Sequence, residues 1–418
     1  MRDLKELTGY DIITEEKIPE VNGTGYILSH KKTKARVLVI ANDDENKVFN
    51  IGFRTPPYDD SGIPHILEHS VLCGSRKYPV KDPFVELAKG SLNTFLNAMT
   101  YSDKTVYPVA SCNEKDFENL MDVYLDAVFY PNIYEHTEIM RQEGWHYELE
   151  TVEGELSYNG VVFNEMKGAF SSPEQQMYSK IEKLLLADTP YKNESGGDPA
   201  AIPTLSQERF LDFHRKYYHP SNSYIYLYGD LDMYKELDYI DKEYLSSFDH
   251  REIDSTIAVQ TAYEQMKDES CFYSIAENES EENQTFLTYN MVVGSSLDKK
   301  QSVAMNILEY AIMDAPGAPL KKALVDAGIG EDVFASFDDG IRQTIFSIVA
   351  RNANMSDKER FVSVIRDTLT DLSGHGEEGK AIDRTSIEAA INNFEFKHKE
   401  ANFGRFPKGL MMGLDAFN

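Results

Sequence analysis

The sequence contains little cysteine, few basic residues and no long apolar run. Its three cysteines, Cys73, Cys112 and Cys271, are widely spaced and odd in number, which argues against a disulfide framework and for a reducing compartment. No apolar run approaches the ~20 residues that a membrane helix requires. The first residues, Met1 to Glu6, are charged and lack the apolar core of a secretory signal. We therefore expect a cytoplasmic protein with no membrane partner.

The shortage of basic residues gives the chain a strongly negative charge. Lysine and arginine total 42 against 70 aspartates and glutamates, and the formal net charge is −28. We expect no nucleic-acid partner, because phosphate binding requires clustered lysines and arginines. An acidic surface usually serves solubility alone. The sharper alternative is an acidic cavity that attracts basic peptides by long-range steering.

Length and patterning predict two domains of the α+β class. The chain has 418 residues and is 41% hydrophobic, which is enough for two sizeable cores. Strand-like alternation is mixed with long helical periods, and no glycine-rich nucleotide-binding motif is present, so we expect antiparallel sheets packed by helices. Pro108 in one expected strand predicts an edge position. The expected strands include 36–40, 48–53, 105–110, 145–149 and 224–228, and the expected helices include 83–88, 114–129 and 161–169.

A polar and irregular stretch predicts the boundary between the domains. We expect a catalytic zinc-binding domain over 1–250, a linker over 251–274 and a second domain over 275–418. Beyond the linker the pattern repeats, and Asn306–Tyr310 shares its middle three residues with His65–His69. Because both histidines are replaced, we expect two tandem repeats of one fold, of which the second binds no zinc. We also expect the second domain to be incomplete, so that the chain is a fragment of something larger.

The most informative motif is a pair of histidines four residues apart with a glutamate beside the second. In a helix, His65 and His69 are neighbours about 5–6 Å apart at the β-carbons, and Glu68 flanks them. Ser61 is a candidate N-cap, and Pro64 suits the first turn. The pattern is the inverted form of the H-E-x-x-H motif of zinc peptidases. The bland alternative is a helix that carries two histidines by chance.

A catalytic zinc ion requires a third protein ligand and one open position. Glu165 is a candidate because it lies on an otherwise apolar helical stripe, where a carboxylate should be buried with a partner or bound to a cation. His146 is the rival ligand, although a histidine flanked by aromatic residues in a strand is more often a packing residue. Cys73 is a conceivable fourth ligand, but it would close the open position, so a small packed thiol is favoured.

These motifs resemble a known family. The chain is similar, over essentially its whole length, to the N-terminal half of enzymes in the presequence-protease and falcilysin branch of the pitrilysin/insulinase zinc metallopeptidases. The resemblance is carried by residues 65–75, 84–91, 160–168, 195–199 and 217–222.

The resemblance implies a set of site residues and a substrate. By similarity, His65, His69 and Glu165 bind one Zn²⁺ ion and Glu68 is the catalytic base. Residues 91–98 are expected to lead into an edge strand to which substrate adds as an extra strand, with Asn97 and Ala98 contacting the substrate backbone. The family fold repeats a sheet-and-helix unit four times, and two halves close into a chamber that admits unfolded peptides.

The family's C-terminal half supplies an arginine and a tyrosine to the substrate site, and no position here can replace them. We therefore expect a zinc metalloendopeptidase whose isolated N-terminal half binds about one zinc and is weakly active or inactive. Its expected partners are unfolded peptides and the missing C-terminal half. Two alternatives are a non-catalytic peptide-binding chamber subunit, which should have lost its histidines or Glu68, and a structural zinc site, which needs four protein ligands.

Overall fold

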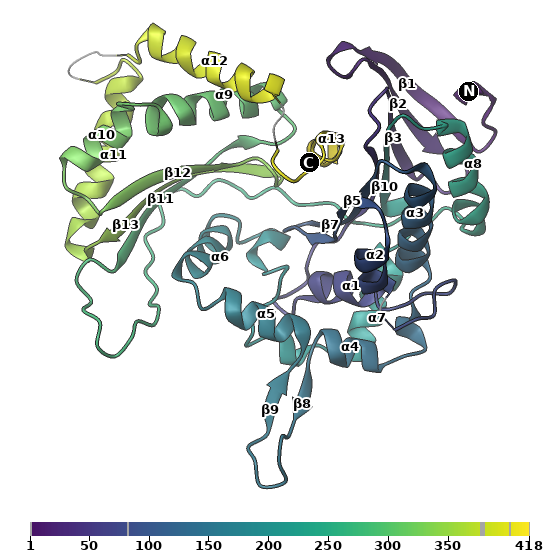
Figure 1. The fold of residues 1–418 in the computed structure, drawn as a ribbon. Helices are drawn as coiled ribbons and strands as arrows, with labels where there is room; N and C mark the ends of the chain where they lie inside the picture. Colours follow the sequence, from purple (N-terminus) through teal and green to yellow (C-terminus); the bar gives the residue numbers. More distant parts are fainter. Residues whose placement is uncertain (1, 82, 377–380, 401–402, 418) are drawn as a thin grey trace. The chain divides into compact units, whose positions relative to one another are not determined.

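The computed structural model describes residues 2–81, 83–376, 381–400 and 403–417 and divides into two compact units (Figure 1). The first unit comprises the described residues up to 172 together with Thr189–Ala258 and Phe403–Phe417. The second comprises Pro173–Asp188 and the described part of 259–402. Each unit combines a sheet with helices, which confirms the predicted α+β class. None of the described helices has the length and apolar character that crossing a membrane requires.

The first unit is built on an eight-stranded sheet in the order β1–β2–β3–β10–β4–β7–β5, with β6 also paired to β7. Neighbouring strands are antiparallel except β3 and β10, which are parallel. This pair corrects the expectation of an antiparallel sheet, and it is possible because residues 42–222, which form both strands and helices, separate the two strands. The strands are β1 (Tyr10–Ile18), β2 (Gly23–His30), β3 (Arg36–Ala41), β4 (Lys47–Arg54), β5 (Asn93–Leu96), β6 (Met99–Thr100), β7 (Lys104–Ser111) and β10 (Ser223–Gly229).

Pro108 predicted that its strand lies at the edge of the sheet, and the structure contradicts this prediction. β7 pairs with β4 on one side and with β5 and β6 on the other. The carbonyl of Pro108 accepts a hydrogen bond from the backbone N–H of Asn97 at 3.3 Å, so its ring nitrogen faces that same side. Because proline has no N–H to donate, the edge strand is interrupted there, between β5 and β6.

Helices cover both faces of this sheet. Alternation along β4 sends Phe49, Ile51 and Phe53 into the larger core, and Val48 into a smaller cluster on the opposite face. Larger-core residues come from α1 (Ile63–Val71), α3 (Glu114–Phe129), α4 (Glu138–Glu143), α5 (Val161–Ala169), α7 (Gln207–Tyr217) and α8 (Met233–Glu243), and α2 (Pro83–Gly90) packs its partly buried side chains against it.

The smaller cluster contains a helix that was expected in the second domain. In α13 (Lys408–Phe417), Gly409 and Gly413 lie one turn apart against the rings of β10. A β-carbon on Gly409 would come within 2.2 Å of the Tyr228 ring, and one on Gly413 within 2.5 Å of the Tyr226 ring. The Tyr226 hydroxyl also donates a hydrogen bond to the Gly409 carbonyl at 2.8 Å. The two glycines therefore seat this helix on the first sheet.

The second unit contains a three-stranded antiparallel sheet in the order β11–β13–β12. The expected division also differs at α6 (Pro173–Leu185), because its Met177 and Ile181 pack with Val349 of this sheet. That the units are repeats of one fold stays a prediction. The strands and the other α-helices of the second unit are β11 (Thr285–Ser295), β12 (Asp332–Asp338), β13 (Gln343–Ala353), α9 (Lys299–Glu309), α10 (Pro319–Asp326), α11 (Lys358–Leu372) and α12 (Arg384–Glu400).

Candidate metal centre

The local sequence explains how α1 presents its two histidines. The N-cap is Gly62 and not Ser61, whose hydroxyl instead donates a hydrogen bond to Asp59. Gly62 has a φ of 69°, in the left-handed region, and a β-carbon there would lie 2.8 Å from the carbonyl oxygen of Gly196. Only glycine fits this contact without strain. Pro64 lies in the first turn of the helix, as predicted.

His65, His69 and Glu165 come together in the structure. Nε2 of each histidine lies 3.7 Å from Oε2 of Glu165. The two rings meet edge to face with their centroids 5.0 Å apart. Across the residues that the structure describes, this is the only group of three or more histidine, cysteine, aspartate or glutamate side chains placed to share a metal ion, with all ligand atoms within 4.8 Å of one another.

The distances from the two Nε2 atoms to the carboxylate oxygen fit zinc. Zinc bonds of about 2.0–2.2 Å at tetrahedral angles place neighbouring ligand atoms about 3.4 Å apart. The observed 3.7 Å between each Nε2 and the carboxylate oxygen is close to that value. Two imidazoles and one carboxylate leave a fourth tetrahedral position open, which is typical of catalytic zinc sites.

The outer ring nitrogens have acceptors of their own. Nδ1 of His65 donates to the Gly196 carbonyl at 3.1 Å, and Nδ1 of His69 lies 3.4 Å from Oε2 of Glu143. Acceptors at Nδ1 keep the proton there and leave the Nε2 lone pairs directed at Glu165, as in metal-binding histidines. Burial lowers the pKa of His69, but the hydrogen bond to Glu143 and nearby carboxylates outweigh it and raise that pKa above its usual value.

Glu68 lies beside this group and is held by Thr100, at the end of β6. The Thr100 hydroxyl donates a hydrogen bond to Oε2 of Glu68 at 2.6 Å. Glu68 is buried, and within the described residues no hydrogen bond to its other oxygen, Oε1, is formed. A buried carboxylate with one fixed oxygen and one available oxygen can accept a proton from a bound water.

The other candidates from the sequence lie outside the group of three. His146 makes a hydrogen bond from its ring to the Arg141 carbonyl at 2.8 Å, and Cys73 places its thiol 3.5 Å from the His69 carbonyl. The Glu165 side chain is 54% exposed, so the expectation that it is buried with a partner is wrong, and the alternative, that it binds a cation, stays a prediction. The contact with the two histidines arises because α5 brings Glu165 to the open side of α1.

Two family models match this chain. The model "Insulinase (Peptidase family M16)" matches residues 48–179, a range that includes His65, Glu68, His69 and Glu165. The model "Peptidase M16 inactive domain" matches residues 204–394. The two ranges come from one family and together cover most of the chain. The chain belongs to the insulinase family, M16.

Curated members of the insulinase family match nearly the whole chain. Protein HypA of Clostridium perfringens is 54% identical over 407 residues, which is 97% of this chain and 41% of that protein. Presequence protease 1 of Arabidopsis thaliana is 43% identical over 421 residues, which is 100% of this chain and 38% of that protein. These matches confirm the predicted resemblance. The chain spans about two fifths of the length of these relatives.

Solved structures of the family share the fold. A protease from Helicobacter pylori superimposes with a TM-score of 0.66 at 16% identity, over 94% of this chain and 89% of that one. Pitrilysin superimposes with a TM-score of 0.65 at 18% identity, over 99% of this chain and 44% of its own. These likenesses show that the chain has the insulinase-type fold.

The residues expected to contact substrate lie at the edge of the first sheet. Asn97 and Ala98 form the interruption between β5 and β6, opposite Pro108. The carbonyl of Asn97 accepts a hydrogen bond from the hydroxyl of Tyr124 on α3 at 3.2 Å. The interrupted edge strand is thus held against α3, and its far end carries Thr100, the partner of Glu68.

Sequence reasoning missed three contacts of the candidate site. Glu143, Thr100 and the carbonyl of Gly196 hold His69, Glu68 and His65, respectively. No spacing rule connects these residues to the helix, because the contacts depend on the fold.

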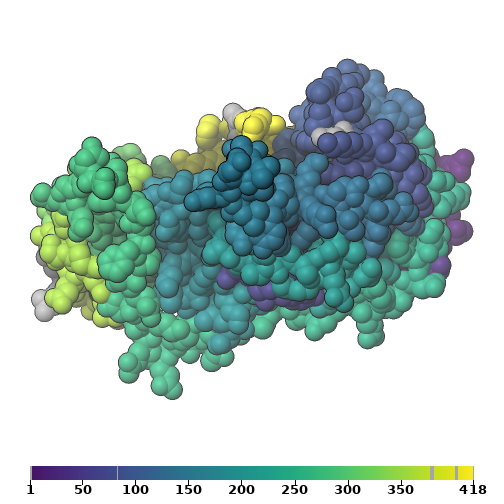
Figure 2. All heavy atoms as spheres, turned by 90° about the horizontal axis from the view of Figure 1, so that it is seen from below, coloured from purple at the N-terminus to yellow at the C-terminus, as the bar shows by residue number. Residues whose placement is uncertain are grey.

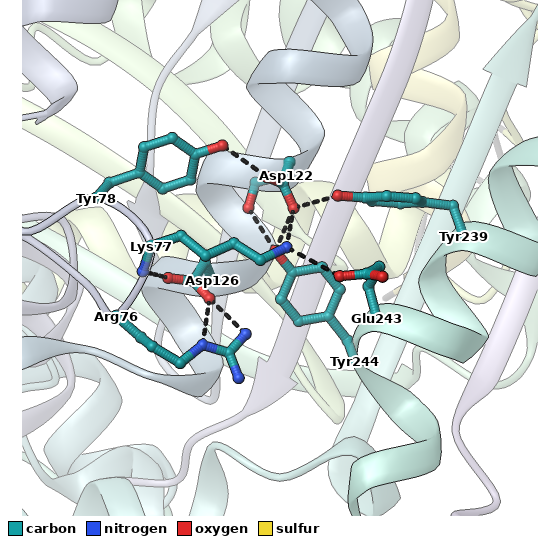
Figure 3. Close-up of polar contacts among 8 residues, drawn as sticks. All are labelled: Arg76, Lys77, Tyr78, Asp122, Asp126, Tyr239, Glu243 and Tyr244. Atoms are coloured by element: carbon teal, nitrogen blue, oxygen red, sulfur yellow. Dashed lines mark hydrogen bonds and ion pairs between the residues drawn. The ribbon is translucent and has the colours of Figure 1, made fainter.

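The segment that follows α1 is anchored by a polar cluster between α3 and α8 (Figure 3). Asp126, which is fully buried, accepts two hydrogen bonds from the Arg76 guanidinium, at 2.8 and 3.1 Å. Burial raises the pKa of Asp122, but its hydrogen bonds outweigh this and lower that pKa below its usual value. The donors to Asp122 are the Lys77 ammonium and the hydroxyls of Tyr78, Tyr239 and Tyr244.

Proposed function

We propose that this chain is the catalytic half of a zinc metalloendopeptidase that cleaves unfolded peptides. The observation that supports it is the convergence of two imidazole Nε2 atoms on one carboxylate oxygen, with Glu68 beside them. The chain's activity, substrate and second half are proposals, because the curated relatives are more than twice its length. Peptidase chemistry is also in keeping with membership of the insulinase family.

Each site residue has its own role in peptide hydrolysis. When bound, Zn²⁺ supplies polarisation of the scissile carbonyl and lowers the pKa of a bound water toward about 7. His65, His69 and Glu165 would hold the ion. Oε1 of Glu68 takes a proton from the attacking water and delivers it to the leaving amine. The Thr100 hydroxyl keeps the other oxygen of Glu68 in place during both transfers.

The edge strand offers a way to hold substrate. An extended peptide can add as a further strand beside β5 and β6, near Asn97 and Ala98, through backbone hydrogen bonds that depend little on sequence. The same edge strand carries Thr100, so the docked peptide and the base share one support. This favours an endopeptidase for unfolded segments, because a folded protein has no free strand to offer.

We also propose that full activity requires the C-terminal half found in longer relatives. The isolated chain then binds zinc but cleaves peptides weakly or not at all. A non-catalytic peptide-binding subunit is the second candidate. The match of residues 204–394 to the model "Peptidase M16 inactive domain" supports a non-catalytic role for the second unit. Retention of Glu68 and both histidines favours catalysis for the first. A cytoplasmic location stays a prediction.

Metal analysis and a fluorogenic peptide assay test these proposals together. The purified chain should contain about one zinc ion, and His65→Ala or Glu165→Gln should remove most of it. Glu68→Gln should keep the zinc but abolish the activity that appears when the C-terminal half is added. Glu208→Gln, an exposed change on α7, serves as the matched control.

Each part of the proposal has its own refutation. Unchanged zinc content in Glu165→Gln would remove that residue from the ligand set. Cleavage by Glu68→Gln at the native rate would exclude Glu68 as the base. Full activity of the isolated chain would show that the C-terminal half is not required.

A further inference from the structure

The helix that carries Glu165 continues, after a short turn, into a helix of the second unit. Glu165 is the fifth of nine residues in α5, which lies in the first unit. α6 begins at Pro173, four residues after α5 ends at Ala169, and it lies in the second unit (Figure 1). A turn of three residues therefore joins the second unit to the helix of a proposed zinc ligand.

This turn is bonded to the end of α5. Ser171 donates its backbone N–H to the Gly168 carbonyl at 3.1 Å and its hydroxyl to the same carbonyl at 2.6 Å. Ser172 donates its backbone N–H to the Ala169 carbonyl at 3.0 Å. Because the turn is short and bonded to α5, a movement of α6 passes to the end of α5.

The start of α5 is fixed within the first unit. The helix follows β9 (Ser157–Asn159), which pairs with β8 (His146–Glu148). The Asn159 side chain accepts a hydrogen bond at 2.6 Å from the side-chain amide of Asn164, which precedes Glu165 in the helix. With its start held, α5 tilts when its end is moved.

Such a tilt changes the position of Glu165. Because Glu165 lies halfway along the helix, a shift of about 1 Å at the end of α5 moves it by about 0.5 Å. Metal–ligand distances in a formed site vary by only about 0.2 Å. The zinc affinity should therefore depend on where α6 holds the end of α5.

Contacts within the second unit hold α6 on its sheet. Met177 and Ile181 are buried and pack with Val349 of β13. Arg351 of the same strand forms an ion pair at 3.0 Å with Glu174, the second residue of α6. The ion pair thus fixes the end of α6 that adjoins α5.

The chain that leaves α6 is anchored before it reaches the metal centre again. The hydroxyl of Tyr191, a buried residue, donates to Asp103 at 2.8 Å, and the Asn193 amide donates to the Pro57 carbonyl at 3.1 Å. Both contacts lie within the first unit and precede Gly196, the acceptor of His65. A movement of α6 therefore acts on Glu165 through α5 more directly than on His65.

We propose that α6 positions Glu165 for the metal ion, so that the second unit sets the zinc affinity of the first. Glu174, Met177 and Ile181 are positioning residues, because they act through Glu165. This inference deepens the proposed function and rests on it, because it takes Glu165 as a zinc ligand. It gives the unit matched by the model "Peptidase M16 inactive domain" a role that requires no chemistry of its own.

Zinc affinity and stability are measured separately on the full chain. Competition with a chromogenic chelator gives the affinity, and urea unfolding of the metal-free form gives the stability. Met177→Ala with Ile181→Ala loosens the seat of α6 and should weaken zinc binding about ten-fold. Glu174→Gln removes only the ion pair and should weaken it about three-fold. Native affinity in both variants would overturn the proposal.

Two control variants separate positioning from stability. Asp332→Asn removes the other partner of the Arg351 guanidinium, at 3.1 Å, and leaves Glu174 in place. Ile365→Ala opens the core of the second unit at a fully buried residue of α11, outside the cluster that contains α6. Both should keep the zinc affinity within about two-fold. An equal loss in Ile365→Ala and in the α6 double variant would overturn the proposal, because zinc binding would then follow the stability of the whole unit.

Hydrogen exchange of the metal-free chain tests the link between α6 and α5 without zinc. Residues 164, 165, 167 and 168 of α5 are exposed, and Figure 2 shows the teal part of the chain that contains α5 at the surface in the view from below. The amides of residues 161–169 should exchange about five-fold faster in Met177→Ala with Ile181→Ala, and at the native rate in Ile365→Ala.

This readout separates the proposal from the proposed function. If the unmodified chain binds no zinc, the proposed function fails, whereas faster exchange in the double variant would still show that α6 holds α5. Unchanged exchange in the double variant would overturn the proposal, whatever the zinc content of the chain.

Discussion

Glu143 offers a test of the metal centre because its contact with that centre is through His69. Glu143 is 7% exposed, and its carboxylate lies 3.4 Å from Nδ1 of His69, on the far side of the ring from Glu165. Burial raises the pKa of Glu143, but hydrogen bonds from His69, Gln142 and Cys73 together outweigh it and keep the pKa below its usual value, so the carboxylate is ionised at neutral pH. Removing the charge should lower the basicity of Nε2 and loosen the ring.

The magnitude follows from the type of contact. Loss of an outer partner of a metal-binding histidine typically weakens metal affinity by about 10–100-fold, or about 1.4–2.7 kcal/mol. Glu143→Gln keeps an acceptor oxygen and loses only the charge, so we expect about ten-fold weaker zinc binding. Glu143→Ala also frees the ring to rotate, so we expect a loss closer to about 100-fold.

Competition with a chromogenic zinc chelator at neutral pH measures these affinities. Glu138→Gln is the matched control, because it makes the same change on α4 at an exposed glutamate whose partner is His136. That variant should bind zinc as the unmodified chain does. Native affinity in both Glu143 variants, with unchanged thermal unfolding of the metal-free forms, would refute the view that His69 Nε2 is oriented for a metal.

Three further changes test the surrounding structure. Thr100→Val should leave the zinc content unchanged but lower kcat of the assembled enzyme about ten-fold or more, whereas Thr100→Ser should retain activity. An equal kcat in the two variants would show that the hydroxyl has no role in the mechanism. Asp122→Asn should destabilise the chain by about 2–4 kcal/mol in urea unfolding at neutral pH. Because the pKa of Asp122 is lowered in the folded chain, its stabilisation is present above the unfolded pKa and is lost as the pH falls through the folded pKa. The loss of stability in Asp122→Asn should therefore shrink below a pH of about 4. A loss of stability independent of pH would contradict this reasoning. Gly413→Ala should cost about 1–3 kcal/mol because of the Tyr226 ring, while Gly90→Ala, with nothing within 4 Å of the added carbon, should not; equal unfolding midpoints would show that α13 does not need the close approach.

The sequence predicted best those elements whose pattern is complete within a few residues. Helix α3 spans Glu114–Phe129, and the expected helix spans 114–129, because its apolar positions recur at helical spacing along its whole length. β4 alternates between two buried faces and was found in the same way. The parallel pairing of β10 with β3 was not predicted, since nothing in either strand specifies the direction of its neighbour.

The placement of α13 failed for a related reason. Gly409 and Gly413 lie at helical spacing, which local sequence can show, but their partners Tyr226 and Tyr228 lie far away in the chain. Proximity in sequence favoured the second domain, and packing overruled it. Pro108 shows the converse: its missing donor predicted an edge position for its own strand, but that strand pairs on both sides, and the neighbouring edge strand is interrupted instead.

In the candidate site, too, local spacing was predictable from the sequence and distant contacts were not. His65 and His69 are one helical turn apart, so their ability to share an ion follows from helix geometry alone. Glu165 was singled out from a supposed apolar stripe, yet the structure brings it to the histidines from an exposed position. Glu143, Thr100 and Gly196 have no local signature, because each meets its partner only after the sheet, α4 and the loop before α7 have assembled. A pair of ligands can therefore be found from the sequence by their spacing, whereas the groups that orient those ligands depend on the fold of the whole unit. Variants at Glu143 and Thr100 report on that fold more directly than variants of the ligands themselves.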